Sequence, residues 1–210
     1  MGVLDRIIDC GVVAVLRADS SSELLNVAGA RREGGVVAIE VTMTTPGALK
    51  VIEEAAAKMK DSIIGVGTVL DPETARAAIL AGAEYIVSPT LHLGVIEMAR
   101  RYGKVVMPGA FTPTEILTAW QAGADVVKVF PASVGGPAYF KDVKGPLPQV
   151  RMMPTGGVDL TTTGAFIKAG ACAVGAGGAM VDKKAVASGK LDVITDTARK
   201  FVEEVRKARA

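Results

Sequence analysis

Two charged residues stand in segments that are otherwise apolar, and both are of types that carry out chemistry. Lys128 lies in the apolar run 126–131, which ends in a proline and is typical of a strand buried on both faces. Glu40 is the one charged residue in the apolar segment 36–42. Lysine is rarely buried without a partner, and burial disfavours its ammonium form. A neutral amine is the nucleophile of Schiff-base chemistry, and a carboxylate can move the protons that this chemistry requires.

Glycines and a few polar residues form a second set of candidates, suited to binding an anion. Two glycine-rich segments, 155–160 and 175–178, follow predicted strands, and backbone N–H groups in such turns commonly bind phosphate. Glycine after a strand is also ordinary turn chemistry. Arg17 follows an apolar strand, where it either clamps a carboxylate or phosphate or lies in solvent. Thr68 and Thr155 also fall at the ends of predicted strands.

The elements that must position these residues repeat along the whole chain. Amphipathic stretches end at glycine and are followed by β-rich apolar runs, which predicts strands over 12–16, 37–41, 63–67, 85–88, 105–108, 126–130, 152–155 and 173–175. Eight strands, each followed by a helical stretch, predict one α/β domain over residues 1–210, a single (β/α)8 TIM barrel. An open doubly wound sheet shares the local pattern, but eight strands favour closure. A final amphipathic helix is expected over 194–208.

A barrel brings the candidate residues together, because active sites gather at the C-terminal ends of barrel strands. Lys128 and Glu40 both fall near such ends. Their purely structural interpretation is a buried ion pair that only satisfies two charges. Two lone charges at the same barrel mouth favour Schiff-base chemistry instead.

Composition argues against several other classes of function. Lysine and arginine number 24 against 22 aspartate and glutamate and are scattered, so nucleic acid and membrane binding have no support. The apolar stretches are strand-length, and the N-terminus does not resemble a signal peptide, so a cytoplasmic location is expected. His92 is the only histidine, and Cys10 and Cys172 have no second cysteine at ligand spacing. We therefore expect neither a metal nor another cofactor.

Several short motifs recur in a characteristic order along almost the whole chain. They are 40–42 (EVT), 65–69 (GVGTV), 88–89 (SP), 107–109 (MPG), 128–131 (KVFP), 144–146 (KGP), 154–158 (PTGGV) and 181–182 (VD). In order and spacing they resemble the 2-keto-3-deoxy-6-phosphogluconate (KDPG) aldolase family. That family includes the 4-hydroxy-2-oxoglutarate (KHG) aldolases.

The resemblance implies a class I aldolase on a homotrimeric barrel. Such an enzyme cleaves KDPG to pyruvate and glyceraldehyde 3-phosphate without metal. By resemblance Lys128 forms the Schiff base, Glu40 is the general acid and base, and Thr68 contacts the substrate carboxylate. The further substrate-binding residues implied are Pro89 and Phe130 in the pyruvate pocket, and Thr155, Gly156 and Gly157 at the phosphate.

The sequence departs from the family pattern at two positions. Thr44 stands where some members have an arginine that binds the pyruvate carboxylate, and Gly178 stands where some have a phosphate-binding serine. Arg17 resembles an arginine that touches substrate in other members, and we expect it to take the anion-binding role that Thr44 lacks. Gly178 can still offer its backbone N–H to a phosphate.

Alternative functions remain open from the sequence. Within the family they are a KHG aldolase, releasing pyruvate and glyoxylate, and a 2-keto-3-deoxy-6-phosphogalactonate aldolase. Outside it, a phosphosugar isomerase would use Glu40 as a base without a covalent imine. A sugar-phosphate binding protein would keep the glycine turns yet tolerate loss of Lys128, and a structural oligomer would tolerate loss of both charges.

Overall fold

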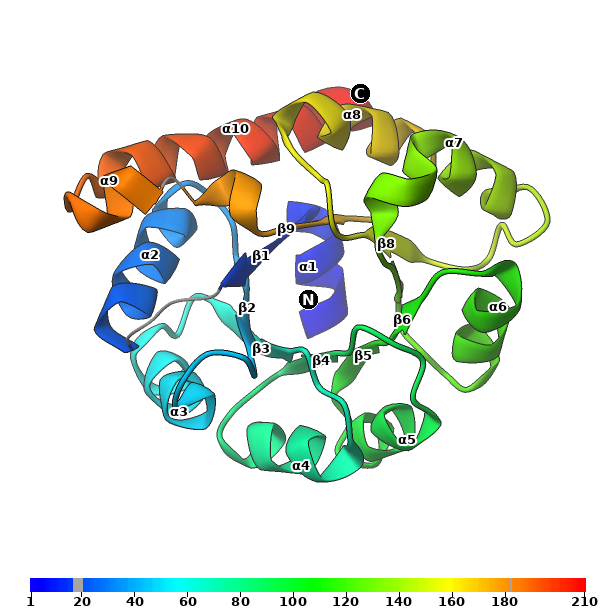
Figure 1. Ribbon diagram of the computed structural model, residues 1–210, viewed down its shortest axis with the longest axis horizontal. Helices are drawn as coiled ribbons and strands as arrows, with labels where there is room; N and C mark the ends of the chain where they lie inside the picture. Colours follow the sequence, from blue (N-terminus) through cyan, green and yellow to red (C-terminus); the bar gives the residue numbers. More distant parts are fainter. Residues whose placement is uncertain (17–20, 182) are drawn as a thin grey trace.

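The computed structural model describes residues 1–16, 21–181 and 183–210. Parallel strands form a ring, and helices surround it (Figure 1). Six strands run in the order β5 (Val105–Met107), β4 (Tyr85–Val87), β3 (Ile63–Gly67), β2 (Ala38–Thr42), β1 (Val12–Leu16) and β9 (Val174–Ala176). Three more run in the order β6 (Gly109–Ala110), β7 (Val127–Val129) and β8 (Met152–Pro154).

Two junctions close these strands into a barrel. Pro108 alone separates β5 from β6, so the two form one strand interrupted where proline has no N–H to donate. Its carbonyl stays in the ladder and accepts from the Lys128 N–H at 2.9 Å. At the other junction, Thr155 after β8 forms a parallel bridge with Gly175 of β9. The predicted eight-stranded barrel is therefore confirmed, with strand ends within two residues of those expected.

The outer helices follow the strands in alternation. They are α2 (Ser21–Glu33), α3 (Ala48–Lys58), α4 (Pro72–Leu80), α5 (Leu93–Arg101), α6 (Pro113–Gln121), α7 (Ala132–Lys144), α8 (Leu160–Lys168), the short η1 (Gly178–Met180), α9 (Lys183–Ala187) and α10 (Leu191–Arg209). Side chains at their N-termini fix several starts; Asp71, for example, accepts from the Thr74 N–H at 2.6 Å. The final helix contains the predicted span 194–208.

Helix α1 (Val3–Cys10) is not among the elements predicted from the sequence. It lies within the ring of strands in Figure 1 and covers the N-terminal end of the barrel interior. Ile7 is its buried residue, and it packs against inward-facing strand residues such as Val13 and Ile63. Arg209 fastens the helix from α10, donating to the carbonyls of Ile8 at 2.6 Å and Asp9 at 2.8 Å.

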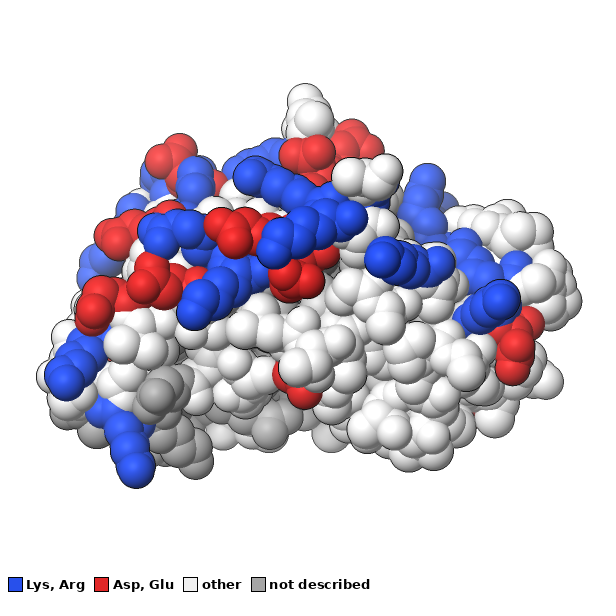
Figure 2. Space-filling model, turned by 90° about the horizontal axis from the view of Figure 1, so that it is seen from above, with Lys and Arg blue, Asp and Glu red and all other residues white. Residues whose placement is uncertain are grey.

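The distribution of surface charge and the length and polarity of the helices bear on what the protein can contact. Figure 2 shows acidic and basic side chains interspersed along the upper part of one flank, and most of the described residues below them are uncharged. Within the described ranges, every helix is too short or too polar to cross a membrane.

Candidate active site

Lys128 and Glu40 both project into the barrel interior near its C-terminal end. Their strand neighbours Val127 and Val129, and Ile39 and Val41, pack outward under the helices, so alternation turns the two charges inward. Lys128 is 6% exposed and Glu40 is 1% exposed. An amine and a carboxylate are thereby held on strands in one water-poor space.

Inward-facing glycines make room for these side chains. A Cβ on Gly67 would lie 1.9 Å from Oε1 of Glu40, so the carboxylate occupies the volume of a missing side chain on β3. A Cβ on Gly175 would lie 2.4 Å from Oγ1 of Thr155. Glycine within a strand commonly marks such a close approach, so the glycines at 67 and 175 are the sequence signal of this space.

Lys128 and Glu40 do not form an ion pair with each other. The ion pairs recorded for the described residues join surface side chains within helices. The side-chain nitrogen of Lys128 (Nζ) instead lies 5.4 Å from the centre of the Phe130 ring. Phe130 is 38% exposed, so an aromatic face borders the amine at the barrel mouth. The ion pair between Lys128 and Glu40 that the purely structural interpretation requires is therefore not formed.

Thr68 occupies a strained backbone conformation just after β3. Its φ of 60° is the only positive value at a non-glycine position in the described part of the chain. A β-branched residue in this region costs on the order of 1–3 kcal/mol, and such strain clusters at functional sites. Thr68 and Thr44 both line a depression of about 210 Å³ at the ends of β2 and β3. The Thr44 hydroxyl lies 2.9 Å from that of Thr42, so two hydroxyls lie together at the edge of this depression.

The turn after β8 is built from two glycines with positive φ, 87° at Gly156 and 77° at Gly157. A Cβ on Gly156 would approach the Phe130 ring at 3.3 Å, and one on Gly157 would lie 2.5 Å from Cβ of Ser133. Thr155 just before them is 8% exposed, and its hydroxyl has no hydrogen-bond partner among the described residues. The turn is therefore compact and offers polar groups to a ligand.

Of the three remaining predicted residues, Pro89 and Gly178 lie at the same end of the barrel. Pro89 crosses over β6, because a Cβ on Gly109 would lie 2.2 Å from the Pro89 carbonyl. Gly178 begins η1, is exposed, and has no atom within 4 Å of where a Cβ would stand. Arg17 lies outside the described residues.

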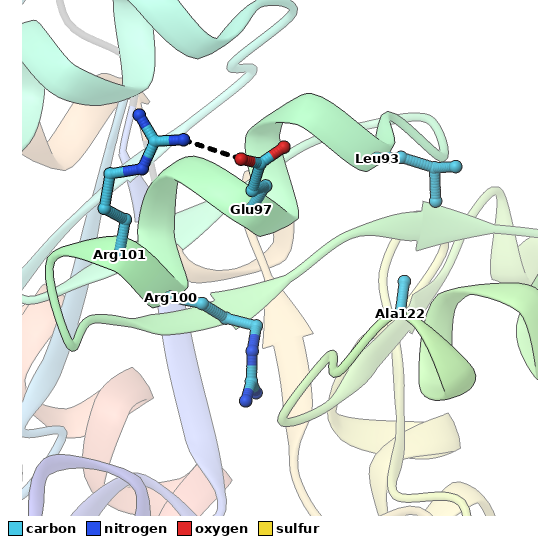
Figure 3. A pocket seen from close by; sticks show the side chains of 5 residues that line it. All are labelled: Leu93, Glu97, Arg100, Arg101 and Ala122. Carbon is cyan, nitrogen blue, oxygen red and sulfur yellow. Dashed lines mark hydrogen bonds and ion pairs between the residues drawn. The ribbon is translucent and has the colours of Figure 1, made fainter.

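A larger depression of about 510 Å³ lies on the outside of the barrel, beside α5. Figure 3 shows its lining side chains, in which Glu97 and Arg101 pair at 2.6 Å. Arg100 donates to the Gly123 carbonyl at 3.0 Å. Its charged groups already have partners, and no nucleophile stands beside a base, so we place the active site at the barrel mouth.

Burial shifts the pKa of two other groups near the barrel interior. Burial, and then the charge of Glu40, raise the pKa of Tyr85 well above its usual value. Burial raises the pKa of Cys172 to about 11, so this thiol stays protonated and is a poor nucleophile at neutral pH. No three His, Cys, Asp or Glu side chains in the described ranges come together as metal ligands.

These observations describe a parallel (β/α)8 barrel with a buried lysine and a carboxylate at its C-terminal mouth, a class of architecture suited to Schiff-base chemistry. Residues 3–197 match the family model for KDPG and KHG aldolases. The chain belongs to this family, that of the class I pyruvate aldolases.

Individual relatives divide between two sugar acids. The 2-dehydro-3-deoxy-6-phosphogalactonate aldolase of Escherichia coli K12 is 37% identical over 168 residues, 79% of this chain and 82% of the relative. The 2-dehydro-3-deoxy-phosphogluconate aldolase of Pseudomonas aeruginosa is 36% identical over 157 residues, 74% and 71% of the two chains. A structure of the Legionella pneumophila KDPG aldolase, with pyruvate captured as a covalent carbinolamine, is similar with a TM-score of 0.83. Its identity is 26%, over 92% of this chain and 96% of that one.

Proposed function

We propose that this aldolase cleaves KDPG to pyruvate and glyceraldehyde 3-phosphate through a Schiff base on Lys128. The observation that carries the proposal is the Lys128 amine, buried at the barrel mouth beside the Phe130 ring. The family membership of the chain supports the reaction class.

The first half of the reaction forms the imine. The neutral amine of Lys128 attacks the C2 ketone of the substrate and gives a carbinolamine. Glu40 moves protons between the nitrogen and the C2 oxygen, so that water leaves and an iminium remains. The pocket that Gly67 leaves open holds the carboxylate in place for these transfers.

The second half of the reaction breaks the C3–C4 bond and releases the two products. Glu40 takes the proton of the C4 hydroxyl, the C3–C4 bond breaks, and its electron pair flows into the iminium to give an enamine. The aldehyde departs. Protonation of the enamine at C3 and hydrolysis of the imine then release pyruvate and restore the free amine of Lys128.

Substrate orientation falls to the residues around the mouth. Thr68 and Arg17 bind the carboxylate, and Phe130 and Pro89 line the pyruvate pocket. The backbone N–H groups after β8 and β9 bind the phosphate, from Gly156, Gly157 and Gly178. These contacts orient the substrate rather than make or break bonds.

Reductive trapping tests the covalent step. Incubation with pyruvate and borohydride should attach a reduced pyruvyl group to Lys128, located by peptide mass spectrometry. Lys128→Met should remain unlabelled, and Lys58, an exposed lysine paired with Glu54, serves as the surface comparison. Unlabelled wild-type protein would instead favour a non-covalent isomerase or a sugar-phosphate binding protein.

The choice of substrate needs a separate assay, because the relatives divide between two sugar acids. Pyruvate release should be compared for KDPG, its galactonate epimer and KHG. Gly178→Ser should lower KM for KDPG through an added hydroxyl, worth about 0.5 to 1.5 kcal/mol, and leave KM for KHG unchanged. The open space around Gly178 makes this substitution sterically mild. Equal changes for both substrates would place the phosphate elsewhere.

We also propose a homotrimer. Leu49, Leu70, Leu93 and Val134 are large hydrophobic residues exposed at or near the N-terminal ends of outer helices, on the same side of the barrel as its mouth. Burying such residues between copies would remove apolar surface from water. Sedimentation equilibrium should give three times the chain mass; a monomer over the assay concentrations would contradict the proposal.

A further inference from the structure

Arg31 occupies a position where helix α2 otherwise buries small and apolar side chains. Leu24, Val27, Ala28 and Arg31 follow helical spacing along one face, and all four are buried. Arg31 is 0% exposed. The Cα–Cβ bonds of a helix tilt towards its N-terminus, so this long side chain runs towards the C-terminal end of the neighbouring strand β1.

The guanidinium of Arg31 has N–H donors that make no hydrogen bond to the described residues. Its Nη1 donates to the carbonyl of Val15 at 3.4 Å, whereas Nε and Nη2 have no hydrogen-bond partner among the described residues. No ion pair with a carboxylate is recorded for it within that part of the chain. Burial lowers its pKa from 12.5 to about 9, which leaves the group positively charged at neutral pH.

The carbonyl that Arg31 reaches lies where the strand ladder between β1 and β9 stops. The Val174 N–H donates to Gly11, and the last pair in register is Ala14 with Ala176. A parallel ladder advances by two residues on each strand, so the Val15 carbonyl would next receive the N–H of Gly178. Strand β9 ends before that, and Arg31 donates to the carbonyl instead. A Cβ on Gly177 would lie 3.8 Å from the same oxygen.

We propose that Arg31 is a positioning residue for the substrate phosphate. Arg31 donates to the Val15 carbonyl in place of the Gly178 N–H, so that N–H stays available to a ligand at the barrel mouth. The guanidinium also fixes a positive charge beside the turn at 177–178. This inference rests on the proposed function, because it assigns a phosphate to that turn. In a water-poor site, a unit positive charge several ångströms from an anion should tighten the binding of that anion roughly tenfold.

The test separates phosphorylated from unphosphorylated substrate. Arg31→Met keeps an unbranched side chain of similar length but removes the charge and the donors. It should raise KM for KDPG about tenfold and leave KM for KHG, and kcat for both, within about twofold. Arg31→Lys keeps the charge and should recover part of the affinity. The matched control is Arg32→Met, since Arg32 is only half-buried and donates to the Asp61 carbonyl instead.

Calorimetric titration with inorganic phosphate supplies a readout that does not depend on catalysis. Phosphate should bind Arg31→Met about tenfold more weakly than wild type. Equal phosphate affinity, or an equal rise in KM for KDPG and KHG, would overturn the inference and leave Arg31 a packing residue. If wild-type protein binds phosphate in an Arg31-dependent way yet releases no pyruvate, the proposed function fails and the anion site stands.

Discussion

The two ends of the barrel interior are built from the same strands but filled in opposite ways. At the N-terminal end, large apolar side chains such as Ile63, Met107 and Met153 fill the space, and Ile7 of α1 covers it. At the C-terminal end, inward positions on neighbouring strands are glycines, and the side chains that remain are charged or polar. A difference of a few residues along a strand thus separates a packed floor from an open mouth.

The contrast shows how one sheet divides stability from chemistry. Burial of apolar area at the floor stabilises the fold by about 25 cal/mol per Å². The mouth gives up that burial, and it also holds buried charges and a threonine with φ of 60°. Substitutions at the two ends should therefore change different measured quantities.

The largest expected effect is at the mouth, for Glu40→Gln. The amide keeps the size of the side chain but cannot accept and return protons, so kcat should fall by about 10² to 10⁴-fold. The free energy of unfolding should change far less than kcat does, because the amide keeps the size of the buried side chain. Steady-state kinetics and urea unfolding measure the two quantities. An unchanged kcat would assign proton transfer to another group.

At the N-terminal floor of the barrel, Ile7→Ala should lower stability and leave kcat nearly unchanged. Truncating this buried side chain should lower the free energy of unfolding by about 2 to 4 kcal/mol, from lost burial and the cavity left behind. Ile8→Ala, a half-buried neighbour on the same helix, is the control and should cost less. A fall in kcat of more than about threefold in Ile7→Ala would show that the floor and the mouth are coupled.

Two glycines on β3 test where the floor ends and the mouth begins. A Cβ on Gly65 would meet the ring of Tyr85 at 2.3 Å, and this buried ring has little freedom to move, so Gly65→Ala should lower stability by about 1 to 3 kcal/mol. Gly67→Ala would displace the end of Glu40, and a misplaced carboxylate should lower kcat by about 10- to 100-fold with little loss of stability. The same outcome for both variants would contradict the proposed boundary.

The smallest effect concerns pH. The pKa of Tyr85 is raised in the folded state, so above pH 10 the unfolded chain loses this proton while the folded chain keeps it. Stability from this residue is complete below pH 10 and is lost as the pH rises further, by up to about 1.4 kcal/mol per pH unit. Tyr85→Phe should flatten the slope of stability against alkaline pH, measured by urea unfolding. An unchanged slope in Tyr85→Phe would contradict this prediction.

Much of the fold was predictable because glycine stops and apolar runs recur for each strand. Lys128 and Glu40 were predictable for a related reason, since a charge in an apolar strand is rare. Helix α1 was not predicted, because its apolar face packs against the barrel interior, which exists only once the strands have closed into a ring. The backbone of Thr68 and the contact of Arg31 with Val15 also depend on tertiary neighbours. An arginine in an amphipathic helix ordinarily indicates a solvent-facing position.

The contacts of Arg209 have a consequence during protein synthesis. This residue joins carbonyls 200 and 201 positions earlier in the chain. At about 5 to 20 residues per second, helix α1 emerges from the ribosome roughly 10 to 40 s before the side chain that fastens it. During that interval the apolar end of the barrel lacks the contact from Arg209, so helix α1 can open more readily to chaperones, proteases and other chains.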